Sequence, residues 1–457
     1  MRENSFVAKL IKILSFTIIP LLSGIVLNFI NKKVPFPYMD EHFHFKQTIS
    51  FYQGNFKQWD SKLTTFPGVF LFNAAILKGL SFITFFRSFF PLAICRCINV
   101  ITPVITNFIL NKYIQSKNES NALENEFFKL IIIFLPISYF YNYLYYTDAF
   151  STLSLILFFH ITTNTKRFRF FSILLSGFIS VLARQNNIIW LNLLPLSEVI
   201  SVLVFLFKTL NIKDFVYKCL DIIKSYISIL ILDIMFVLFL IKNNFSVVLG
   251  DKSHHEMVIN LAQINHFLFF VLFLFPRIHF YLLTIPKVLK DNQRLKKLIT
   301  IFVILTAFLF VCNIHSHIHD FILSDNRHYT FYYFRKIYNV TPIKTVLTLY
   351  SSIIFSLVLE DNISLFFDSK YYAYGFCFIL CLIPAKLVEV RYFTPCIIVL
   401  LLLLYKEGSN IKRLQQNLFN CLNILWHLVI NCVVLYIFIY KPFKNEFFHN
   451  EMSRFMF

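Results

Sequence analysis

The stretch ILSFTIIPLLSGIVLNFI, residues Ile13–Ile30, decides the fold, because it carries no charge and is long enough to cross a bilayer as a helix. Arg2, Lys9 and Lys12 precede it. The stretch is too long for the core of a signal peptide and has no small-residue cleavage site after it. We therefore expect it to remain in the membrane as a signal anchor, with its basic flank in the cytoplasm.

Apolar stretches of similar length recur along the 457 residues, of which 57% are hydrophobic and 15% are charged. Soluble domains have about 25% charged residues, and one soluble core could not bury so much apolar surface. The formal net charge of +19 first indicates lysines on the cytoplasmic side of a membrane. We expect an all-α polytopic membrane protein with a single transmembrane domain, residues 1–457, and no nucleic-acid partner.

Each long apolar run is predicted to be a helix, because a helix satisfies its backbone polar groups within the segment. We expect about 13–14 membrane helices from runs of this length. The candidates are 13–30, 67–86, 91–112, 127–144, 149–163, 170–183, 188–206, 222–241, 264–284, 298–313, 343–359, 371–386, 392–405 and 418–440.

The loops between these segments have two compositions. The basic loops, which the positive-inside rule places in the cytoplasm, are Thr165–Arg169, Lys208–Lys218, Lys287–Lys297 and Lys406–Arg413. Alternation then places on the opposite side Arg184–Asn187, Lys242–Gln263, His315–Thr341 and Glu389–Tyr392. The 31–66 loop joins this second group only if one early segment, with 67–86 or its neighbour as the first choice, is re-entrant or lies partly in the interface.

The 31–66 loop carries Asp40 and Glu41 beside two histidines, His42 and His44, between apolar segments. Carboxylates are costly to desolvate there unless they are used, and one of them could take the proton from a sugar hydroxyl. A phosphate leaving group needs no general acid, so one carboxylate would suffice. The alternative is a short amphipathic helix at the membrane surface, with Asp40 as its N-cap and Glu41 in its first turn.

The His315–Thr341 loop holds a second polar cluster. His315, His317, His319 and Asp320 would suit zinc or manganese if this segment were extended. Arg327 and His328 fit an anionic headgroup better, because a guanidinium binds phosphate oxygens in a bidentate manner. The alternative to both is a solvated loop with ordinary surface ion pairs.

Three smaller polar groups lie in the other loops on the same predicted side: Gly250–Glu256, Glu389–Arg391 and Arg184–Asn186. An arginine near a helix end with a carboxylate two residues away is typical of a phosphate contact, and snorkelling is the alternative. No nucleotide-binding or hydrolase motif occurs. Most of the nine cysteines lie in or beside apolar runs, so we expect neither a disulfide nor a cysteine metal site.

Several motifs together resemble the dolichyl-phosphate-glucose-dependent alpha-1,2-glucosyltransferases of lipid-linked oligosaccharide assembly. They are Tyr38–His44, Trp59–Asp60, Thr64–Gly68, Tyr145–Asp148, Arg184–Ile188, Gly250–Glu256, Asp325–Tyr332, Glu389–Phe393 and Arg454–Phe457. The resemblance covers essentially the whole chain. His315 and His317 have no counterpart in it, which weakens the metal interpretation.

The resemblance implies a GT-C glycosyltransferase fold in the endoplasmic reticulum membrane, with a lumenal active site and no metal or cofactor. Its partners would be dolichyl phosphate glucose, a dolichyl-diphosphate oligosaccharide and membrane lipid. Asp40 best matches the catalytic base, with Glu41 second. The donor phosphate would be bound by Arg327, His328 and Arg391. The sugar and acceptor residues would be His44, Trp59, Asp60, Asp251, His255, Glu256, Asp325 and Asn326.

We therefore expect an inverting enzyme that adds the terminal alpha-1,2-linked glucose. The nearest alternative is a GT-C enzyme that uses dolichyl phosphate mannose. A transporter is the alternative from another class, but the polar motifs crowd one membrane face instead of forming paired broken helices. A lumenal O-acyltransferase is a third possibility, and it rests only on the histidine-rich loop.

Overall fold

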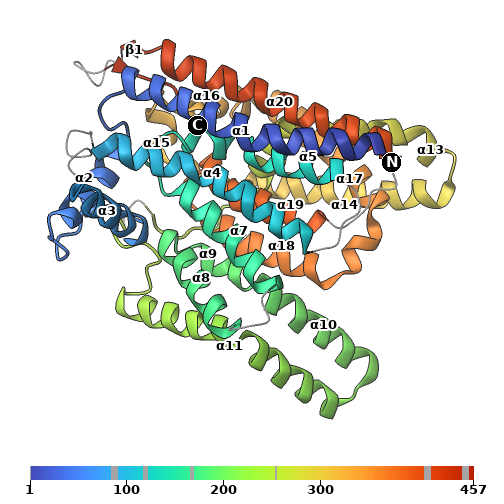
Figure 1. Ribbon diagram of the computed structural model, residues 1–457. Helices are drawn as coiled ribbons and strands as arrows, with labels where there is room; N and C mark the ends of the chain where they lie inside the picture. Colours follow the sequence, from blue (N-terminus) through green and yellow to red (C-terminus); the bar gives the residue numbers. More distant parts are fainter. Residues whose placement is uncertain are drawn as a thin grey trace. The chain divides into compact units, whose positions relative to one another are not determined.

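A computed structural model describes residues 2–83, 91–116, 122–164, 169–252, 255–405, 413–444 and 452–457. Within these residues the chain is almost entirely helical (Figure 1). It divides into two compact units. The first unit is Met1–Pro195 with Phe205–His254, and the second unit is Leu196–Val204 with His255–Phe457.

The first unit is made of helices, two of which are joined by the long connection 53–67. Its elements are α1 (Arg2–Lys33), α2 (Glu41–Tyr52), α3 (Gly68–Ser81), α4 (Pro91–Gln115), α5 (Ala122–Ile133), α6 (Pro136–Tyr141), α7 (Asp148–Asn164), α8 (Arg169–Ala183), α9 (Asn187–Leu191) and α11 (Ile212–Lys242). Helix α10 (Leu193–Thr209) contributes residues to both units.

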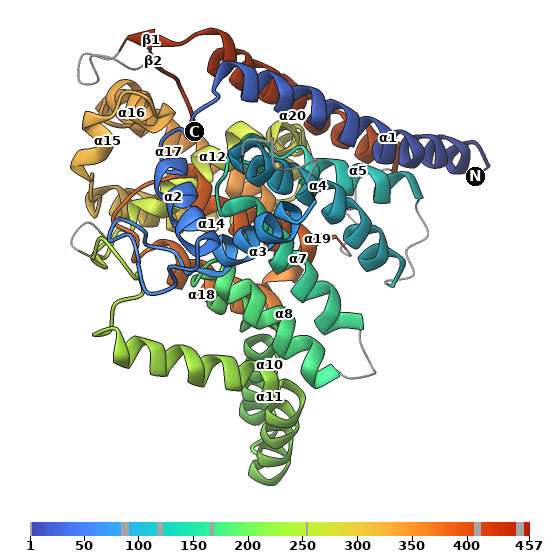
Figure 2. The same cartoon turned by 60° about the vertical axis from the view of Figure 1, so that its left-hand side comes forward.

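The second unit contains the remaining helices and one small antiparallel sheet. Its helices are α12 (Ala262–Leu274), η2 (Pro276–Thr284), α13 (Ile285–Leu289), α14 (Asn292–Ile314), α15 (Asp320–Ser324), α16 (Tyr329–Tyr333), η3 (Phe334–Tyr338), α17 (Thr341–Asp361), η4 (Ile363–Phe367), α18 (Ser369–Leu382), η5 (Val390–Tyr392), α19 (Phe393–Leu404) and α20 (Arg413–Tyr440). Strands β1 (Phe443–Lys444) and β2 (Met452–Ser453) pair beyond the end of α20 (Figure 2).

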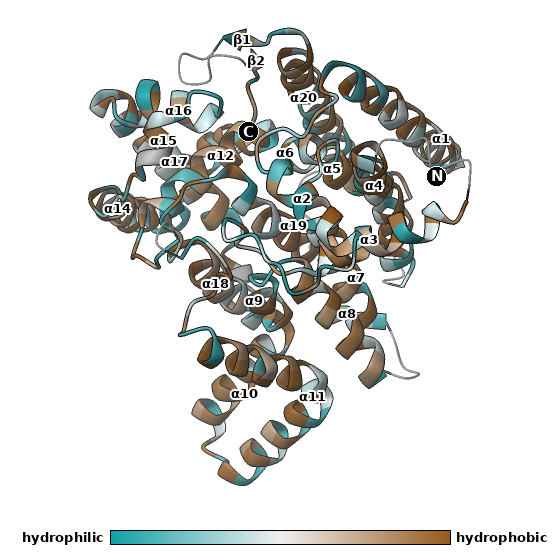
Figure 3. Ribbon diagram, turned by 90° about the vertical axis from the view of Figure 1, so that its left-hand side faces the viewer, coloured by the Kyte–Doolittle hydropathy of each residue, from teal (hydrophilic) through white to brown (hydrophobic). Residues whose placement is uncertain are grey.

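The membrane class predicted from the sequence is confirmed. Among the described residues, six helices are long and apolar enough to cross a membrane: Phe6–Lys33, Pro91–Gln115, Ile212–Lys242, Asn292–Ile314, Thr341–Asp361 and Asn417–Tyr440. The bent pair Ala262–Leu274 and Pro276–Leu289 would make a seventh. These long helices are mostly hydrophobic along their length (Figure 3). The chain is therefore a multi-pass, all-α membrane protein. Its described residues form fewer full-length spans than the sequence suggested.

Prolines explain two of the differences from the predicted spans. The predicted span 127–144 is divided because Leu135, which precedes Pro136, takes an extended ψ of 117°. The predicted span 264–284 is divided at Phe275 and Pro276, and its two halves meet at 89°. A proline donates no backbone hydrogen bond and clashes with the preceding turn, so a continuous helix is lost at each point.

Side chains satisfy the backbone groups that the break at Pro276 exposes. Trp426 and His427 on α20 donate to the carbonyl oxygens of Phe273 (2.7 Å) and Leu274 (3.1 Å). His279 donates to the carbonyl oxygen of Leu272 at 2.9 Å. A membrane interior offers few water partners for such groups, so these contacts let the helix bend at this depth.

In the first unit, α4 packs against α1, α5 and α7, while α2 packs against α3. The core between α2 and α3 is apolar and includes Phe51, Val69, Phe70 and Leu77. Helix α3 is shorter than a full span, as an interfacial or re-entrant segment would be, but that assignment stays a prediction. This packing holds the start of α2 against α4, where the predicted acidic motif lies.

Candidate functional site

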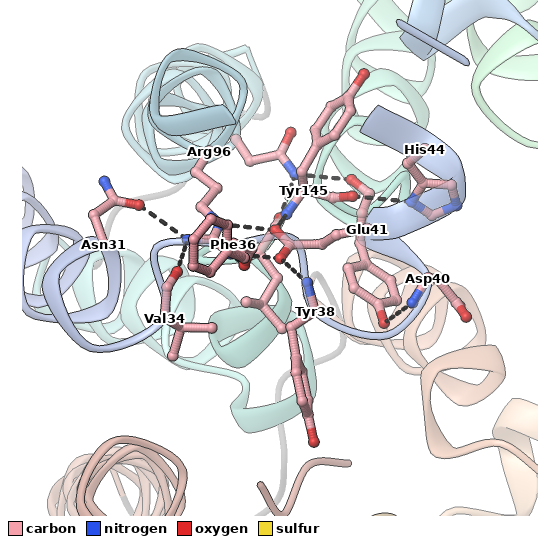
Figure 4. A network of polar contacts seen from close by, with 12 residues as sticks. Asn31, Val34, Phe36, Tyr38, Asp40, Glu41, His44, Arg96 and Tyr145 are labelled. Atoms are coloured by element: carbon pink, nitrogen blue, oxygen red, sulfur yellow. Dashed lines mark hydrogen bonds and ion pairs between the residues drawn. The ribbon is translucent and has the colours of Figure 1, made fainter. Parts of the chain in front are cut away.

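The two adjacent carboxylates of the first loop have different surroundings. Glu41 opens α2 and is fully buried, whereas Asp40 precedes the helix and is half-buried. Asp40 occupies the N-cap position, but its carboxylate makes no capping hydrogen bond. Its backbone N–H donates to the Tyr146 hydroxyl at 3.1 Å, and its carboxylate turns away from Glu41 (Figure 4). The structure therefore separates the two predicted catalytic candidates.

Glu41 forms an ion pair with Arg96 of α4. Arg96 Nε donates to Glu41 Oε1 at 2.8 Å, and Arg96 Nη2 donates to Oε2. The backbone N–H of Tyr38 donates to Oε2 at 2.9 Å, and that of Tyr145 donates to Oε1. Both side chains of the ion pair are 0% exposed. Each Glu41 oxygen thus accepts two hydrogen bonds, as a buried carboxylate requires.

Arg96 also holds the backbone that leads to the acidic motif. Its Nη1 donates to Asn31 Oδ1 at 3.1 Å and to the carbonyl oxygen of Val34 at 2.7 Å. Its Nη2 donates to the carbonyl oxygen of Phe36 at 3.2 Å. Arg96 is not among the residues predicted from the sequence. The available signal was an arginine within the apolar run 91–112, since such residues usually have a partner and a role.

One turn further along α4, Asn99 fixes the tyrosine-rich segment between α6 and α7. Its amide donates to the carbonyl oxygens of Leu144 at 2.7 Å and Tyr146 at 2.8 Å. Tyr146 in turn holds the backbone of Asp40. Burial raises the pKa of Tyr145, whose hydroxyl lies 2.7 Å from that of Thr48 on α2. Helix α4 therefore sets the position of Asp40 through two routes.

The other predicted residues of this loop take part in packing. His44 is buried against Phe70, and its Nδ1 donates to the carbonyl oxygen of Tyr145 at 2.9 Å. Trp59 contacts the ring of Phe70 as well, and its Nε1 donates to the carbonyl oxygen of Leu63. The Asp60 carboxylate accepts from the backbone N–H of Lys62 at 3.0 Å. Their predicted contacts with sugars stay predictions.

Three segments that are distant in the sequence meet beside this loop. The carbonyl oxygen of Thr64 accepts from Leu249 N at 3.2 Å and from Gln185 Nε2 at 2.9 Å. The backbone N–H of Asp251 donates to the carbonyl oxygen of Ser61 at 2.8 Å. A Cβ at position 250 would lie 2.2 Å from that same oxygen, so only glycine fits there. The predicted motifs at 59–68, 184–188 and 250–251 thus form one cluster in the first unit.

Arg184 belongs to this cluster and has a carboxylate partner. Its Nη2 donates to Asp148 Oδ2 at 3.0 Å, and its Nε donates to the Thr147 hydroxyl at 3.1 Å. Asp148 begins α7 and is buried. The motif at 145–148 and the motif at 184–188 are therefore joined by an ion pair.

In the second unit, Arg327 is held by Asp325 two residues before it. Arg327 Nε and Nη2 each donate to one oxygen of the Asp325 carboxylate, both at 2.8 Å. His328 Nε2 lies 3.9 Å from Asp325 Oδ2, and Asn326 lies half-buried between them in sequence. Burial alone would raise the pKa of Asp325, but the hydrogen bonds and charges of Arg327 and His328 outweigh it and lower that pKa.

Arg391 repeats this arrangement in the connection before α19, where its Nε donates to Glu389 Oε2. The preceding turn is bonded to two polar side chains near the start of α12. Gln263 Nε2 donates to the carbonyl oxygens of Ala385 at 3.0 Å and Leu387 at 3.1 Å. Asn260 Nδ2 donates to the carbonyl oxygen of His317 at 3.3 Å. Three of the loops predicted to share one membrane side are therefore in contact within the second unit.

The remaining predicted residues divide between the units. Asp251 lies in the first unit, while His255, half-buried, and Glu256, exposed, lie in the second unit. Ser253 and His254 of the same motif lie outside the described residues, as do Arg167 and Lys412 of the basic loops.

The histidine cluster has no common environment. His315 and His317 are exposed, whereas His319 is buried. In the part of the chain that the structure describes, no three His, Cys, Asp or Glu side chains come together as a metal site.

Comparison with known proteins identifies relatives that align with nearly the whole chain. Each of the following three relatives is named "Dol-P-Glc:Glc(2)Man(9)GlcNAc(2)-PP-Dol alpha-1,2-glucosyltransferase". The Candida albicans protein is 29% identical, with 96% of each chain covered. The Rattus norvegicus protein is 27% identical over 95% of this chain and 96% of its own length. A Homo sapiens protein is 26% identical over 93% of this chain and 94% of its own length.

No solved structure gives a significant match. The sequence profile of one family covers residues 34–403, which include the buried ion pair, the segments that meet at Thr64 and both arginine–carboxylate loops. The chain belongs to the DIE2/ALG10 family.

Proposed function

We propose that this chain transfers glucose from dolichyl phosphate glucose to a diglucosylated dolichyl-diphosphate oligosaccharide and forms an alpha-1,2 bond. The names of the relatives support this reaction, because the alignments extend over nearly the whole of both chains. They give no support to the mannosyl donor or the transporter. A glycosyltransferase on membrane-embedded lipid substrates also suits a multi-pass helical chain.

Asp40 is the proposed general base, and its surroundings are the observation that carries the mechanism. The carboxylate stands at the start of α2 without capping it, while its backbone is fixed by Tyr146. It would take the proton from the acceptor 2-hydroxyl as that oxygen attacks C1 of the donor glucose. The bond between C1 and the phosphate oxygen breaks, and dolichyl phosphate leaves with the electron pair.

Glu41 is proposed as a positioning residue and not as the base. Both of its oxygens are occupied by Arg96 and by backbone N–H groups. Each oxygen already accepts two hydrogen bonds, which fills the four acceptor positions of the carboxylate, and the side chain is 0% exposed. Together with Arg96, it fixes the loop from which Asp40 projects.

Arg327, His328 and Arg391 are the proposed phosphate-binding groups. Charge grows on the departing phosphate in the transition state, so fixed cations there lower the barrier. Their carboxylate partners, Asp325 and Glu389, hold the two guanidinium groups in place. His44, Trp59, Asp60, Asp251, His255, Glu256, Asp325 and Asn326 are proposed to shape the sugar and acceptor sites.

The proposed location is the endoplasmic reticulum membrane, with the Asp40, Asp251, Arg327 and Arg391 loops in the lumen. The hydrogen bonds of Thr64 in the first unit, and those of Asn260 and Gln263 in the second unit, support a shared side for the loops within each unit. Single cysteines at positions 40, 327 and 290 can be tested with an impermeant maleimide on sealed microsomes. Labelling of position 327, but not of 40, from the cytosolic face would contradict the assignment.

The reaction is tested with the purified chain, a diglucosylated lipid-linked acceptor and either dolichyl phosphate glucose or dolichyl phosphate mannose. We expect transfer of glucose alone, with an alpha-1,2 product. Asp40→Asn keeps the shape of the side chain but cannot take the proton, so its rate should fall by about 100- to 10,000-fold with donor binding preserved. Mannose transfer at a comparable rate would replace the proposed donor.

Asp214→Asn is the matched control for the Asp40 variant. Asp214 is an exposed aspartate near the start of α11, where it interacts with Asn211. Its substitution changes the same chemical group and should leave the rate unchanged. An Asp40→Asn enzyme within about tenfold of the unsubstituted one would remove Asp40 from the role of base.

A further inference from the structure

The segment Met452–Phe457, here called the return segment, packs against the loop that holds Arg327 and His328. It begins in β2, which pairs with β1 beyond the end of α20, and then passes beside α16 (Figure 2). The sequence resemblance included its residues Arg454–Phe457, but the proposed mechanism does not assign them a role. Their contacts indicate one.

Backbone hydrogen bonds join the return segment to the loop. The N–H of Met456 donates to the carbonyl oxygen of Arg327 at 2.9 Å, and the N–H of Tyr329 donates to the carbonyl oxygen of Met456 at 3.0 Å. These bonds form a parallel bridge between His328 and Met456. Met456 is 0% exposed. The backbone on both sides of His328 is therefore fixed by this one residue.

The return segment also sets the ring of His328. The main-chain oxygen of Phe457 lies 2.9 Å from His328 Nδ1, and such an oxygen can only accept. Nδ1 must therefore carry a proton in this contact, which leaves Nε2 on the side of Asp325. The contact fixes both the tautomer and the direction of the imidazole.

The side chains of two adjacent residues, Arg454 and Phe455, fasten the middle of the return segment. Arg454 Nη1 donates to the carbonyl oxygens of Phe438 at 2.6 Å and Ile439 at 2.9 Å, in the last turn of α20. These carbonyl oxygens lack helical partners, and an arginine is well suited to cap them. The Phe455 ring stacks on the Phe443 ring, with 4.4 Å between the ring centroids. It is also nearly parallel to the Tyr329 ring, with 6.5 Å between the centroids and 11° between the planes.

We propose that the return segment is a positioning element of the donor site, which ties the loop bearing Arg327 and His328 to the end of α20. The inference rests on the proposed function, since it takes these two residues as the donor-phosphate ligands. A membrane helix is a firmer support than a loop, and misplacement of a ligand by about 1 Å can cost as much as a hundredfold in rate. The return segment supplies that support without touching the substrate itself.

The test compares two methionines of the return segment. Met456→Ala removes a fully buried side chain next to Arg327, whereas Met452→Ala changes one that is 51% exposed in β2. We expect Met456→Ala to raise the KM for dolichyl phosphate glucose by about tenfold or more, with the KM for the acceptor unchanged. Met452→Ala should change neither value by more than about twofold, as is usual for surface substitutions.

Two further variants keep the result decisive. Met456→Leu nearly conserves the volume and should restore the donor KM. If Met456→Ala does not fold, Phe455→Leu weakens the ring contacts with less loss of volume and should raise the donor KM in the same direction. A fall in the amount of folded enzyme with both KM values unchanged would reduce the return segment to a structural role and overturn the proposal.

Arg327→Ala separates this outcome from a failure of the proposed function. If Arg327→Ala raises the donor KM and Met456→Ala does not, the donor site stands and the role of the return segment is wrong. If Arg327→Ala leaves the donor KM unchanged, the assignment of the donor ligands is itself wrong. The size of the Met456→Ala effect relative to Arg327→Ala then measures how much of the ligand placement depends on the return segment.

Discussion

An arginine–carboxylate pair stabilises the first loop, and another lies in the Asp325–Tyr332 loop. The two pairs differ in the sequence separation of their partners. Glu41 and Arg96 lie 55 positions apart, whereas Asp325 and Arg327 lie two positions apart, as do Glu389 and Arg391. The long-range pair fixes a whole loop to a membrane helix. The local pairs fix only the direction of their own guanidinium groups. Sequence separation therefore distinguishes a pair that holds the fold from pairs that direct the arginines proposed to bind the donor phosphate.

Exposure follows the same division. Glu41 and Arg96 are 0% exposed, while the side chains of Arg327 and Asp325 are 18% and 22% exposed. Breaking a buried pair costs about 3–5 kcal/mol, because one charge stays buried without a partner. Pairs in contact with water contribute about 0–1 kcal/mol. The two regions should therefore respond very differently to the loss of an arginine.

The largest effect is expected for Arg96→Met, which leaves the Glu41 carboxylate buried and unpaired. We predict a loss of about 3–5 kcal/mol in the free energy of unfolding, and no measurable transfer, because the Asp40 loop loses its support. The measurement is thermal unfolding of the purified protein in detergent. Arg391→Met, in the second unit, should change stability by about 1 kcal/mol or less.

A double variant isolates the charge from the packing. Arg96→Met with Glu41→Gln removes both charges and keeps two side chains of similar size, so it should recover part of the lost stability. Activity should not return in the double variant, because the hydrogen bonds to Val34 and Phe36 are still missing. If Arg96→Met and Arg391→Met are equally stable, burial does not distinguish the two regions.

The sequence predicted the membrane class and the motifs, because apolar length and residue type are local properties. It did not predict the breaks at Pro136 and Pro276, because 127–144 and 264–284 were each expected to be one span. Pro136 and Pro276 each end a helix inside an apolar run, and their effect depends on whether other side chains, such as Trp426 and His427, satisfy the exposed backbone. Such compensation comes from helices that are distant in the sequence, so a single segment does not reveal it.

The same distinction applies to the site. The partners of Arg327 and Arg391 could be read from the sequence, because they lie two residues away. The partner of Glu41 could not be read from the sequence, because Arg96 reaches Glu41 only when α4 packs behind the first loop. The placement of the return segment beside His328 depends on tertiary structure as well. Residue types and short spacings indicated the polar motifs and their local ion pairs. The contacts between motifs that are distant in the sequence depend on tertiary packing.

The next largest effect is expected for Arg327→Lys and Arg391→Lys, which keep the charge but lose the planar fork. A lysine cannot make the paired bonds that Arg327 makes to Asp325, so the cation is no longer directed. We predict a rise of about tenfold in the donor KM for each, with stability nearly unchanged. Arg335→Lys, at an exposed arginine over the Phe331 ring, is the control and should behave as the unsubstituted chain.

A smaller effect is expected for Asp325→Asn, and its sign depends on pH. The pKa of Asp325 is lowered in the folded chain, so its stabilising contribution is present above the ordinary carboxyl range and is lost as the pH falls through the lowered value. We predict that Asp325→Asn lowers the free energy of unfolding at neutral pH by about 1 kcal/mol or less, and that the difference vanishes in acid. A difference that persists or grows in acid would contradict the assigned ion pair.

The smallest effect is expected on removal of divalent metal ions, for which we predict no loss of transfer. The phosphate charge can be met by Arg327, His328 and Arg391, which are already directed by Asp325, Phe457 and Glu389, respectively. A metal site of the kind used for pyrophosphate needs several converging carboxylates, and in the described ranges no such group comes together. Transfer is measured in excess EDTA, with addition of Mn²⁺ or Mg²⁺ afterwards. Activity that EDTA removes and either ion restores would show that the arginines of the second unit do not neutralise the phosphate alone, and would make the His315–Asp320 segment the first place to look for ligands.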